Sequence, residues 1–183
     1  MMTEFIYELK IPKERIAVLI GKNGQVKKEI ESATETSLDV DSKEGDIFIK
    51  GEDGLGLYTA REVVQAIGRG FNPNIAFLLL KSDYTFDMIM MKDFTGKSKD
   101  TLMRLKGRVI GKEGKCRATI EELTECCVSV YGKTISVIGT AENVPIARQA
   151  VESLLRGSTH ANVYKWLEKK RREIKKSRLL GSL

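Results

Sequence analysis

The chain has 183 residues, of which 42% are hydrophobic and 31% charged, a composition typical of a folded protein with one or two domains. No apolar run approaches the roughly 18 residues of a membrane span. The N-terminal sequence MMTEFIYELK lacks the basic region and apolar core of a signal peptide. These features exclude a disordered or membrane-spanning chain, and we expect a cytoplasmic protein.

Cysteine and histidine are too few for a metal centre. The thiols are Cys116, Cys126 and Cys127, and the only histidine is His160. An odd number of cysteines that includes an adjacent pair fits neither a disulfide framework nor a zinc knuckle. We expect buried or half-buried free thiols, no metal and no cofactor.

Positive charge increases along the chain. Residues 1–70 carry 10 basic and 13 acidic side chains, residues 81–157 carry 13 and 10, and residues 158–183 carry 8 and 2. The net charge therefore rises from −3 through +3 to +6. A polyanion would bind mainly to the later parts of the chain.

Residues 4–69 predict the order strand, helix, turn, helix, strand, strand, helix. Side chains that alternate between apolar and polar indicate strands, and apolar residues three or four apart indicate helices. We expect strands at 4–11, 37–41 and 47–50, and helices at 13–20, 25–33 and 57–69.

The same order recurs after a short connecting helix at 75–80, which Asn72 and Pro73 introduce. The second series has a polar insertion at 92–100 that the first lacks, and a basic helix at 158–178 follows it. We expect strands at 84–91, 128–130 and 135–137, and helices at 102–110, 115–123 and 146–156.

Identical residues at corresponding positions indicate an internal duplication. Two independent helical hairpins would not share them. The pairs are Ile30-Glu31 with Ile120-Glu121, Thr34 with Thr124, Gly51 with Gly139, Ala60-Arg61 with Ala147-Arg148, and Arg69-Gly70 with Arg156-Gly157.

Each series places a Gly-x-x-Gly turn between its first two helices. The turns are Gly21-Lys22-Asn23-Gly24 and Gly111-Lys112-Glu113-Gly114. Glycine permits a tight bend and close approach of another chain, and the start of the next helix favours an anion. This geometry suits a clamp for the backbone of a single-stranded nucleic acid.

With these turns, both units resemble the KH family of RNA-binding domains, over about residues 4–70 and 83–157. Three further runs resemble the archaeal partner-of-Nob-one (Dim-two) family: TIEELT from Thr119, VYGKT from Val130 and GSTH from Gly157. The resemblance implies an α+β fold with two tandem type I KH domains, each β-α-α-β-β-α. We expect a first domain at 1–72, a connecting helix at 73–82, a second domain at 83–157 and a basic C-terminal helix and tail at 158–183.

The resemblance also implies a function and partners. Members of this family bind ribosomal RNA near the 3′ end of the small-subunit precursor during maturation. The implied protein partners are a PIN-domain nuclease and translation initiation factor 2 alpha. A KH adaptor that delivers other RNAs to decay or translation machinery is the alternative. No group suited to nucleophilic or acid–base chemistry accompanies the turns, so we do not expect an enzyme.

The charges around the two turns predict that the second domain dominates RNA binding. In the first domain, the strand and loop opposite the turn carry Asp39, Asp41, Glu44 and Asp46, which repel phosphate. Its turn either binds RNA weakly or only builds the fold. We predict RNA contacts from Arg108, Ile110, Gly111, Lys112, Glu113, Gly114, Lys115, Arg117, Val130 and Lys133, and weaker ones from Gly21, Lys22, Asn23 and Gly24.

Two features leave alternatives open. An acid at Glu113 is unfavourable beside phosphate unless its side chain points outward. The basic face of the C-terminal helix is either solvated or in contact with RNA, and Trp166 lies on the apolar stripe of that helix, which favours packing over base stacking.

Overall fold

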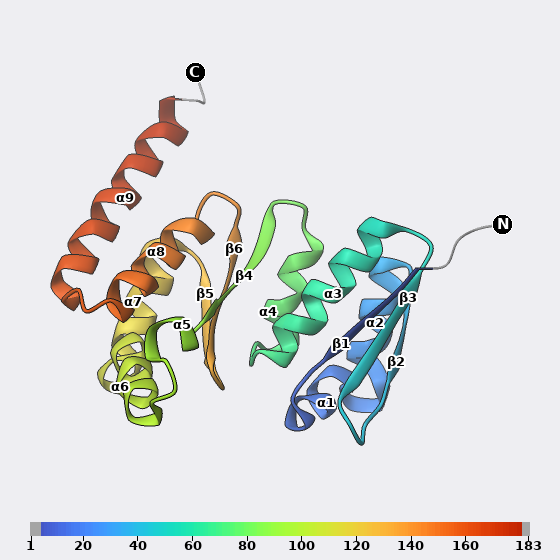
Figure 1. The fold of residues 1–183 in the computed structure, drawn as a ribbon. Coiled ribbons are helices and arrows are strands. Elements are labelled where there is room, and N and C mark those ends of the chain that lie inside the picture. Colours follow the sequence, from blue (N-terminus) through green and yellow to red (C-terminus); the bar gives the residue numbers. More distant parts are fainter. Residues whose placement is uncertain (1–4, 181–183) are drawn as a thin grey trace. The chain divides into compact units, whose positions relative to one another are not determined.

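The computed structural model describes residues 5–180 and confirms an α+β architecture with two KH domains and a C-terminal helix (Figure 1). The chain divides into two compact units, Met1–Phe86 and Asp87–Leu183. Each unit contains one three-stranded sheet with helices packed on one of its faces. Both sheets place the third strand in the middle, in the orders β1-β3-β2 and β4-β6-β5.

The first unit follows the predicted order of elements. In β1 and β3, the side chains of Tyr7, Leu9, Ile47 and Ile49 point toward the helices, and Ile47 and Ile49 are fully buried. The elements are β1 (Phe5–Lys10), α1 (Lys13–Ile20), the 3-10 turn η1 (Lys22–Gly24), α2 (Gln25–Thr34), β2 (Thr36–Val40), β3 (Asp46–Gly51), α3 (Gly54–Gly68), α4 (Pro73–Ala76) and the 3-10 helix η2 (Phe77–Leu80).

The second unit repeats this order with one added helix. Its elements are β4 (Tyr84–Met90), α5 (Lys92–Thr95), α6 (Lys99–Ile110), the 3-10 turn η3 (Lys112–Gly114), α7 (Lys115–Thr124), β5 (Cys127–Tyr131), β6 (Thr134–Thr140), α8 (Val144–Leu155) and α9 (His160–Leu180). The added helix α5 lies in the polar insertion. Helix α9 packs against α7 and α8 (Figure 1).

Residues shared by the two repeats make the same hydrogen bonds. Glu31 Oε1 accepts from the Leu38 amide at 2.7 Å, and Glu121 Oε1 accepts from the Val128 amide at 2.8 Å. Each carboxylate thereby ties its helix to the following strand. Thr34 and Thr124 likewise donate from Oγ1 to the carbonyl four residues earlier, both at 2.7 Å. The sequence identities therefore mark the same structural joints in each domain.

Helices α3 and α6 begin earlier than the apolar periodicity predicts, and the connecting helix is divided in two. Helix α6 begins at Lys99 rather than 102 because Ser98 Oγ caps the Thr101 amide. Helix α3 begins at Gly54 rather than 57 because Asp53 accepts from the Gly56 amide at 2.7 Å. The connecting helix predicted at 75–80 is instead two short pieces, α4 and η2. Caps are polar and lie outside the apolar pattern, so hydrophobic spacing misses them.

Two of the three thiols and one face of the C-terminal helix belong to the core of the second unit. Cys116 and Cys126 are buried and Cys127 is half-buried, all three as free thiols, as predicted. Burial raises the pKa of the Cys126 thiol to about 11, so it stays protonated at neutral pH. Val163 and Leu167 of α9 are buried in the same core, and Trp166 packs against it. The packing role predicted for Trp166 is confirmed.

Candidate nucleic-acid interface

The two Gly-x-x-Gly turns have nearly the same backbone geometry. Gly21 has φ 72° and ψ 177°, and Gly111 has φ 74° and ψ 175°. This combination is essentially restricted to glycine. The last glycine of each turn, Gly24 or Gly114, is left-handed with φ 75°. Each turn thus joins two helices through an αL residue immediately before α2 or α7.

The first and last glycines of each turn are needed for different reasons. A Cβ on Gly111 would lie 2.6 Å from Cys116 Cβ, and one on Gly21 would lie 2.5 Å from Val26 Cγ2. The first glycine is therefore required for packing against the next helix. A Cβ on Gly114 would meet nothing within 4 Å. The last glycine faces open space, where another chain can approach the backbone.

The middle of the second turn exposes both of its side chains. Lys112 and Glu113 are exposed, and Glu113 Oε2 lies 3.7 Å from Lys115 Nζ. Glu113 thus points into solvent, the orientation that makes an acid in this turn tolerable. Its φ of 54° equals that of Asn23 in the first turn. Asparagine enters the left-handed region more readily than glutamate does, so the second turn carries the less suitable residue.

The remaining predicted site residues lie on both sides of the second turn. Lys115 and Arg117 are exposed on α7, and Arg117 Nε is 3.8 Å from Glu121 Oε2. Lys133 is exposed in the turn between β5 and β6. Ile110 and Val130 are half-buried, and Val130 packs against the core. The second domain thus presents exposed cations and half-buried aliphatic side chains, and their assembly into one RNA groove stays a prediction.

Arg108 has a structural role that the sequence did not reveal. Its Nε donates to the Leu154 carbonyl at 3.1 Å and its Nη2 donates to the Ser158 carbonyl at 2.6 Å. His160 Nε2 lies 2.8 Å from the Arg108 carbonyl. Arg108 therefore caps the C-terminal end of α8 and holds the start of α9. Contact between Arg108 and RNA stays a prediction. The Arg108 side chain already donates hydrogen bonds to two carbonyls.

The first domain makes the same pair of bonds from a different helical position. Arg15 Nε donates to the Ile67 carbonyl at 2.8 Å, and its Nη2 donates to the Phe71 carbonyl at 2.7 Å. Arg15 lies six residues before Gly21, whereas Arg108 lies three residues before Gly111. The arginine has moved by about one helical turn while its function is retained. Alignment on the glycines pairs Arg108 with Val18 and hides this equivalence.

The acidic loop of the first domain carries its own neutralising cations. Lys10 Nζ lies 3.1 Å from Asp46 Oδ1, and Lys13 Nζ lies 3.8 Å from Glu44 Oε1. A hydrogen bond to Asp46 raises the pKa of Lys10. Asp41 Oδ1 accepts from the Lys43 amide at 2.8 Å and so shapes the loop. Lys10 and Lys13 are therefore paired with acids of this loop.

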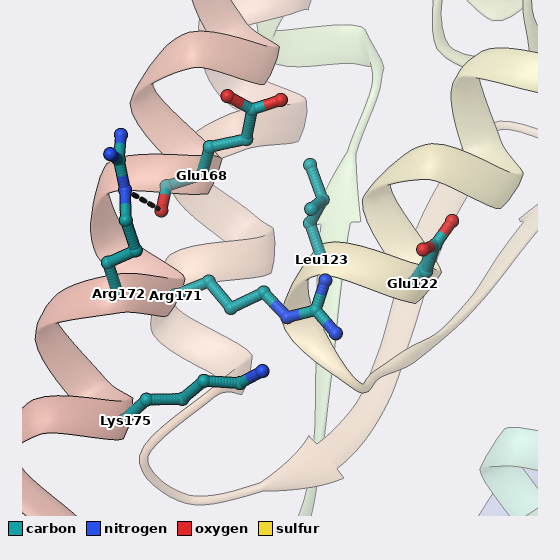
Figure 2. Close-up of a pocket in the computed structure, with 6 residues that line it drawn as sticks. All are labelled: Glu122, Leu123, Glu168, Arg171, Arg172 and Lys175. Carbon is teal, nitrogen blue, oxygen red and sulfur yellow. Dashed lines mark hydrogen bonds between the residues drawn. The ribbon is translucent and has the colours of Figure 1, made fainter.

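Helix α9 and helix α7 enclose a polar groove with a volume of about 530 Å³ (Figure 2). Arg171 extends across it toward Leu123 at the end of α7, whereas Arg172 turns away and donates from Nε to the Glu168 carbonyl at 3.3 Å. Near its C-terminal end, α9 is held by Arg178, whose guanidinium contacts Glu125 and Glu142. Part of the basic face therefore holds α9 on its own domain, and the rest is exposed.

Helix α9 also supports the second Gly-x-x-Gly turn from behind. Tyr164 of α9 interacts with the side chain of Cys116, the residue against which Gly111 packs. Burial, followed by this interaction, raises the pKa of Tyr164 to about 12. The phenol is therefore neutral under ordinary conditions and can keep this contact. We therefore expect removal of α9 to disturb the packing of Cys116 beneath the turn.

Comparisons with known families support the architecture. The family described as "Eukaryotic type KH-domain (KH-domain type I)", which represents the second KH domain of PNO1, matches residues 85–172, and the general KH domain family matches residues 6–66. The first match extends into α9. A KH domain-containing protein of Methanocaldococcus jannaschii is 50% identical over 174 residues, which cover 93% of this chain and 76% of that protein. The RNA-binding protein pno1 of Dictyostelium discoideum is 30% identical over 166 residues, covering 88% and 70%.

The chain belongs to the archaeal PNO1/Dim2 family. A solved PNO1/Dim2 structure from Pyrococcus horikoshii, in a complex described as a/eIF2alpha-aDim2p-rRNA, is 44% identical with a TM-score of 0.86. It covers 93% of this chain and 96% of that one. That relative thus forms a complex with ribosomal RNA and an initiation factor subunit.

Two negative observations apply to the described part of the PNO1/Dim2 chain, residues 5–180. None of its helices combines the length and apolar character needed to cross a membrane. None of its histidine, cysteine, aspartate and glutamate side chains form a group of three or more suited to a metal ion.

Proposed function

We propose that this protein is a non-catalytic, single-stranded RNA-binding assembly factor of the small ribosomal subunit, acting in the cytoplasm. The observation that carries the proposal is the turn at Gly111–Gly114. Its last glycine faces open space, and Lys112 and Lys115 of the same segment are exposed. We propose that exposed Lys133 and half-buried Ile110 and Val130 complete the groove. Backbone amides and cations hold phosphates, while the apolar floor supports bases.

Family relatives support ribosomal RNA as the ligand. The relatives include proteins named pre-rRNA-processing protein PNO1, and the Pyrococcus horikoshii structure contains ribosomal RNA. We propose the 3′ region of the small-subunit precursor as the bound segment. We also propose translation initiation factor 2 alpha as a partner, on the strength of the complex with that factor's counterpart. A PIN-domain nuclease is the second proposed protein partner.

The second domain is proposed to dominate binding. Its loop between β5 and β6 carries Lys133 and no acids, whereas the corresponding loop of the first domain holds Asp41, Glu44 and Asp46. Like charges in the groove wall weaken phosphate binding at short range, and salt screens this repulsion only in part.

Crosslinking in cells tests the ligand. The expected result is enrichment of the small-subunit precursor near its 3′ end, and this enrichment should be lost in a variant with Lys112→Asp and Glu113→Asp. Enrichment of messenger RNA in place of the precursor would support the adaptor alternative. Incubation of purified protein with labelled RNA and magnesium tests the absence of catalysis, because cleavage that persists through purification and scales with protein would contradict it.

A further inference from the structure

The insertion peculiar to the second domain forms one wall of a cavity that shares only Lys133 with the predicted site. The cavity has a volume of about 320 Å³, roughly ten times the ~30 Å³ share of one water molecule in the liquid. Its other wall is the turn between β5 and β6. The lining residues are Lys92, Thr95, Gly96, Lys97, Ser98, Lys99, Leu102 and Lys133.

The cavity is built by packed and hydrogen-bonded backbone. Phe94 of α5 packs against the core, and the guanidinium of Arg156 lies 5.7 Å from the centre of its ring. The Phe94 amide donates to the Met91 carbonyl, and the Gly96 amide donates to the Lys92 carbonyl, both at 3.0 Å. The Met91 amide in turn donates to the Lys133 carbonyl at 3.0 Å, which joins the insertion to the opposite wall.

The lining of the cavity carries lysine side chains that are not paired with acids. Lys92, Lys97, Lys99 and Lys133 are all exposed, and none of them forms an ion pair with any residue in the described range 5–180. The two acids of the insertion, Asp93 and Asp100, do not line the cavity. Helix α6 begins here, with Ser98 as its cap, so its N-terminal dipole adds to the attraction for an anion.

The cavity and the Gly-x-x-Gly turn lie at opposite ends of one helix. Helix α6 runs from Lys99, at the cavity, to Ile110, next to Gly111. Its 12 residues span about 18 Å at 1.5 Å per residue. Lys133 belongs both to the cavity and to the predicted rim of the groove. An RNA strand that runs alongside α6 from the turn would reach the cavity after about four nucleotides, the length that a KH groove clamps.

We propose that this lysine pocket, formed by Lys92, Lys97, Lys99 and Lys133, binds a backbone phosphate of the RNA strand just beyond the nucleotides in the second KH groove. The proposal rests on the proposed RNA-binding function and extends it to a site outside the KH groove. A single strand fits better than an acidic protein segment because Lys133 belongs both to the pocket and to the predicted groove. Lysine binds phosphate as a point charge without demanding one base sequence, so the pocket adds affinity rather than specificity.

The corresponding place in the first domain supplies a matched control. There the Ile11 amide donates to the Gly45 carbonyl at 3.0 Å, the counterpart of the bond from Met91 to Lys133. No insertion follows β1, and Lys10 and Lys13 are paired with Asp46 and Glu44. Substituting three lysines at this edge of the first domain removes as many positive charges as substituting three lysines of the pocket. We do not expect this edge of the first domain to bind phosphate.

The test compares two triple variants. The pocket variant carries Lys92→Gln, Lys97→Gln and Lys99→Gln and keeps Lys133, which belongs to the predicted groove. The control carries Lys10→Gln, Lys13→Gln and Lys43→Gln. The probes are the four-nucleotide ribosomal RNA segment identified by crosslinking and an eight-nucleotide version with two native nucleotides added on each side. Affinity is measured for both probes over a series of salt concentrations, and circular dichroism checks folding.

On the eight-nucleotide probe, we expect the pocket variant to bind about tenfold more weakly at low salt than the unmodified protein. Its plot of log affinity against log salt should flatten by about 0.7 for each phosphate released. The four-nucleotide probe should bind the pocket variant and the unmodified protein alike, and the control should bind both probes as the unmodified protein does.

Three results would overturn the proposal, each in a different way. An unchanged slope and affinity on the longer probe, with the short probe still bound, would reject the pocket alone and favour an acidic protein segment as its occupant. Failure of the unmodified protein to bind either probe would reject the proposed function itself. An equal loss in the control variant would show a general charge effect and would also reject the pocket.

Discussion

The two KH domains have nearly the same backbone but different electrostatics at one edge of the sheet. At this edge, the end of the first strand meets the loop that joins the second strand to the third. Both edges are closed by an equivalent backbone hydrogen bond of 3.0 Å. In the first domain, Lys10 and Lys13 pair with acids there, while in the second, Lys92, Lys97, Lys99 and Lys133 surround a cavity. The comparison shows that one fold, duplicated, can be specialised by surface charge and one insertion while its core joints stay unchanged.

The largest expected difference between the domains concerns the second turn. Lys112→Asp with Glu113→Asp should leave the fold intact, since both side chains are exposed and aspartate tolerates the left-handed backbone at position 113. RNA affinity should fall about 10- to 100-fold, because a charge-assisted contact is worth ~1.5–3 kcal/mol. Fluorescence anisotropy with the crosslinked RNA measures it, and undiminished affinity in a folded variant would make the turn purely structural.

The second prediction tests the capping arginines, which the domains place one turn apart. Arg15→Ala and Arg108→Ala each remove two side-chain bonds to carbonyls at the end of the third helix. Each should lower the free energy of unfolding of its own domain by ~1–3 kcal/mol, as measured by urea denaturation. Arg104→Ala, at an exposed position of α6, is the control and should cost under ~0.5 kcal/mol.

The same arginine variants separate two roles for Arg108. Because two of its donors hold carbonyls, we expect its substitution to reduce RNA affinity less than the change at Lys112 does. A loss as large as that at Lys112, in protein that remains folded, would show that the guanidinium contacts phosphate as well as the helix end.

The third prediction concerns α9, which follows the second domain only. Lys169, Lys170, Arg172, Lys175 and Lys176 are changed to glutamine, while Arg171 is kept because it reaches toward α7 (Figure 2). Buried Val163 and Leu167 should keep the helix docked. The salt dependence of RNA binding should flatten by about 0.7 per phosphate lost, with an unchanged preference among RNA sequences. An identical slope would assign this face to solvent or to a protein.

A smaller effect is expected from the first turn. Lys22→Asp with Asn23→Asp changes the charge by −3, compared with −2 for the second-turn variant, yet should weaken binding by only about threefold or less. The reason is that the acidic loop already limits phosphate density near this turn. A greater loss here than in the second-turn variant would show that the comparison of charges misjudges which domain binds RNA.

The smallest effect is expected from variants that exchange the third residues of the two turns, Asn23 and Glu113. Glu113→Asn removes an acid and places in the left-handed position the residue type that the first domain uses. The exposed contact with Lys115, at 3.7 Å, contributes little. We expect a gain of roughly 0.5 kcal/mol in stability and a modest increase in affinity. Asn23→Glu should reverse the stability change in the first domain, and a gain in both variants would contradict the backbone argument.

The sequence determined the repeat, the order of elements and the turns, because these depend on short-range patterns. Apolar spacing follows helix and strand periods, and a Gly-x-x-Gly between two helical patterns requires a bend whichever core lies beneath it. Even the paired identities Glu31 with Glu121 and Thr34 with Thr124 could be read as equivalent positions, and they make equivalent bonds.

Only the tertiary structure decided what long polar side chains do. Arg108 and Lys133 are both cations near the second turn, yet one holds carbonyls 46 and 50 residues away and the other lines an open cavity. The lysines of the insertion were visible as residues, but the pocket exists because the backbone bond from Met91 to Lys133 brings two distant segments together. A long charged side chain pairs with whichever group the fold places within its reach. The distances between segments far apart in the chain are not encoded in the local sequence.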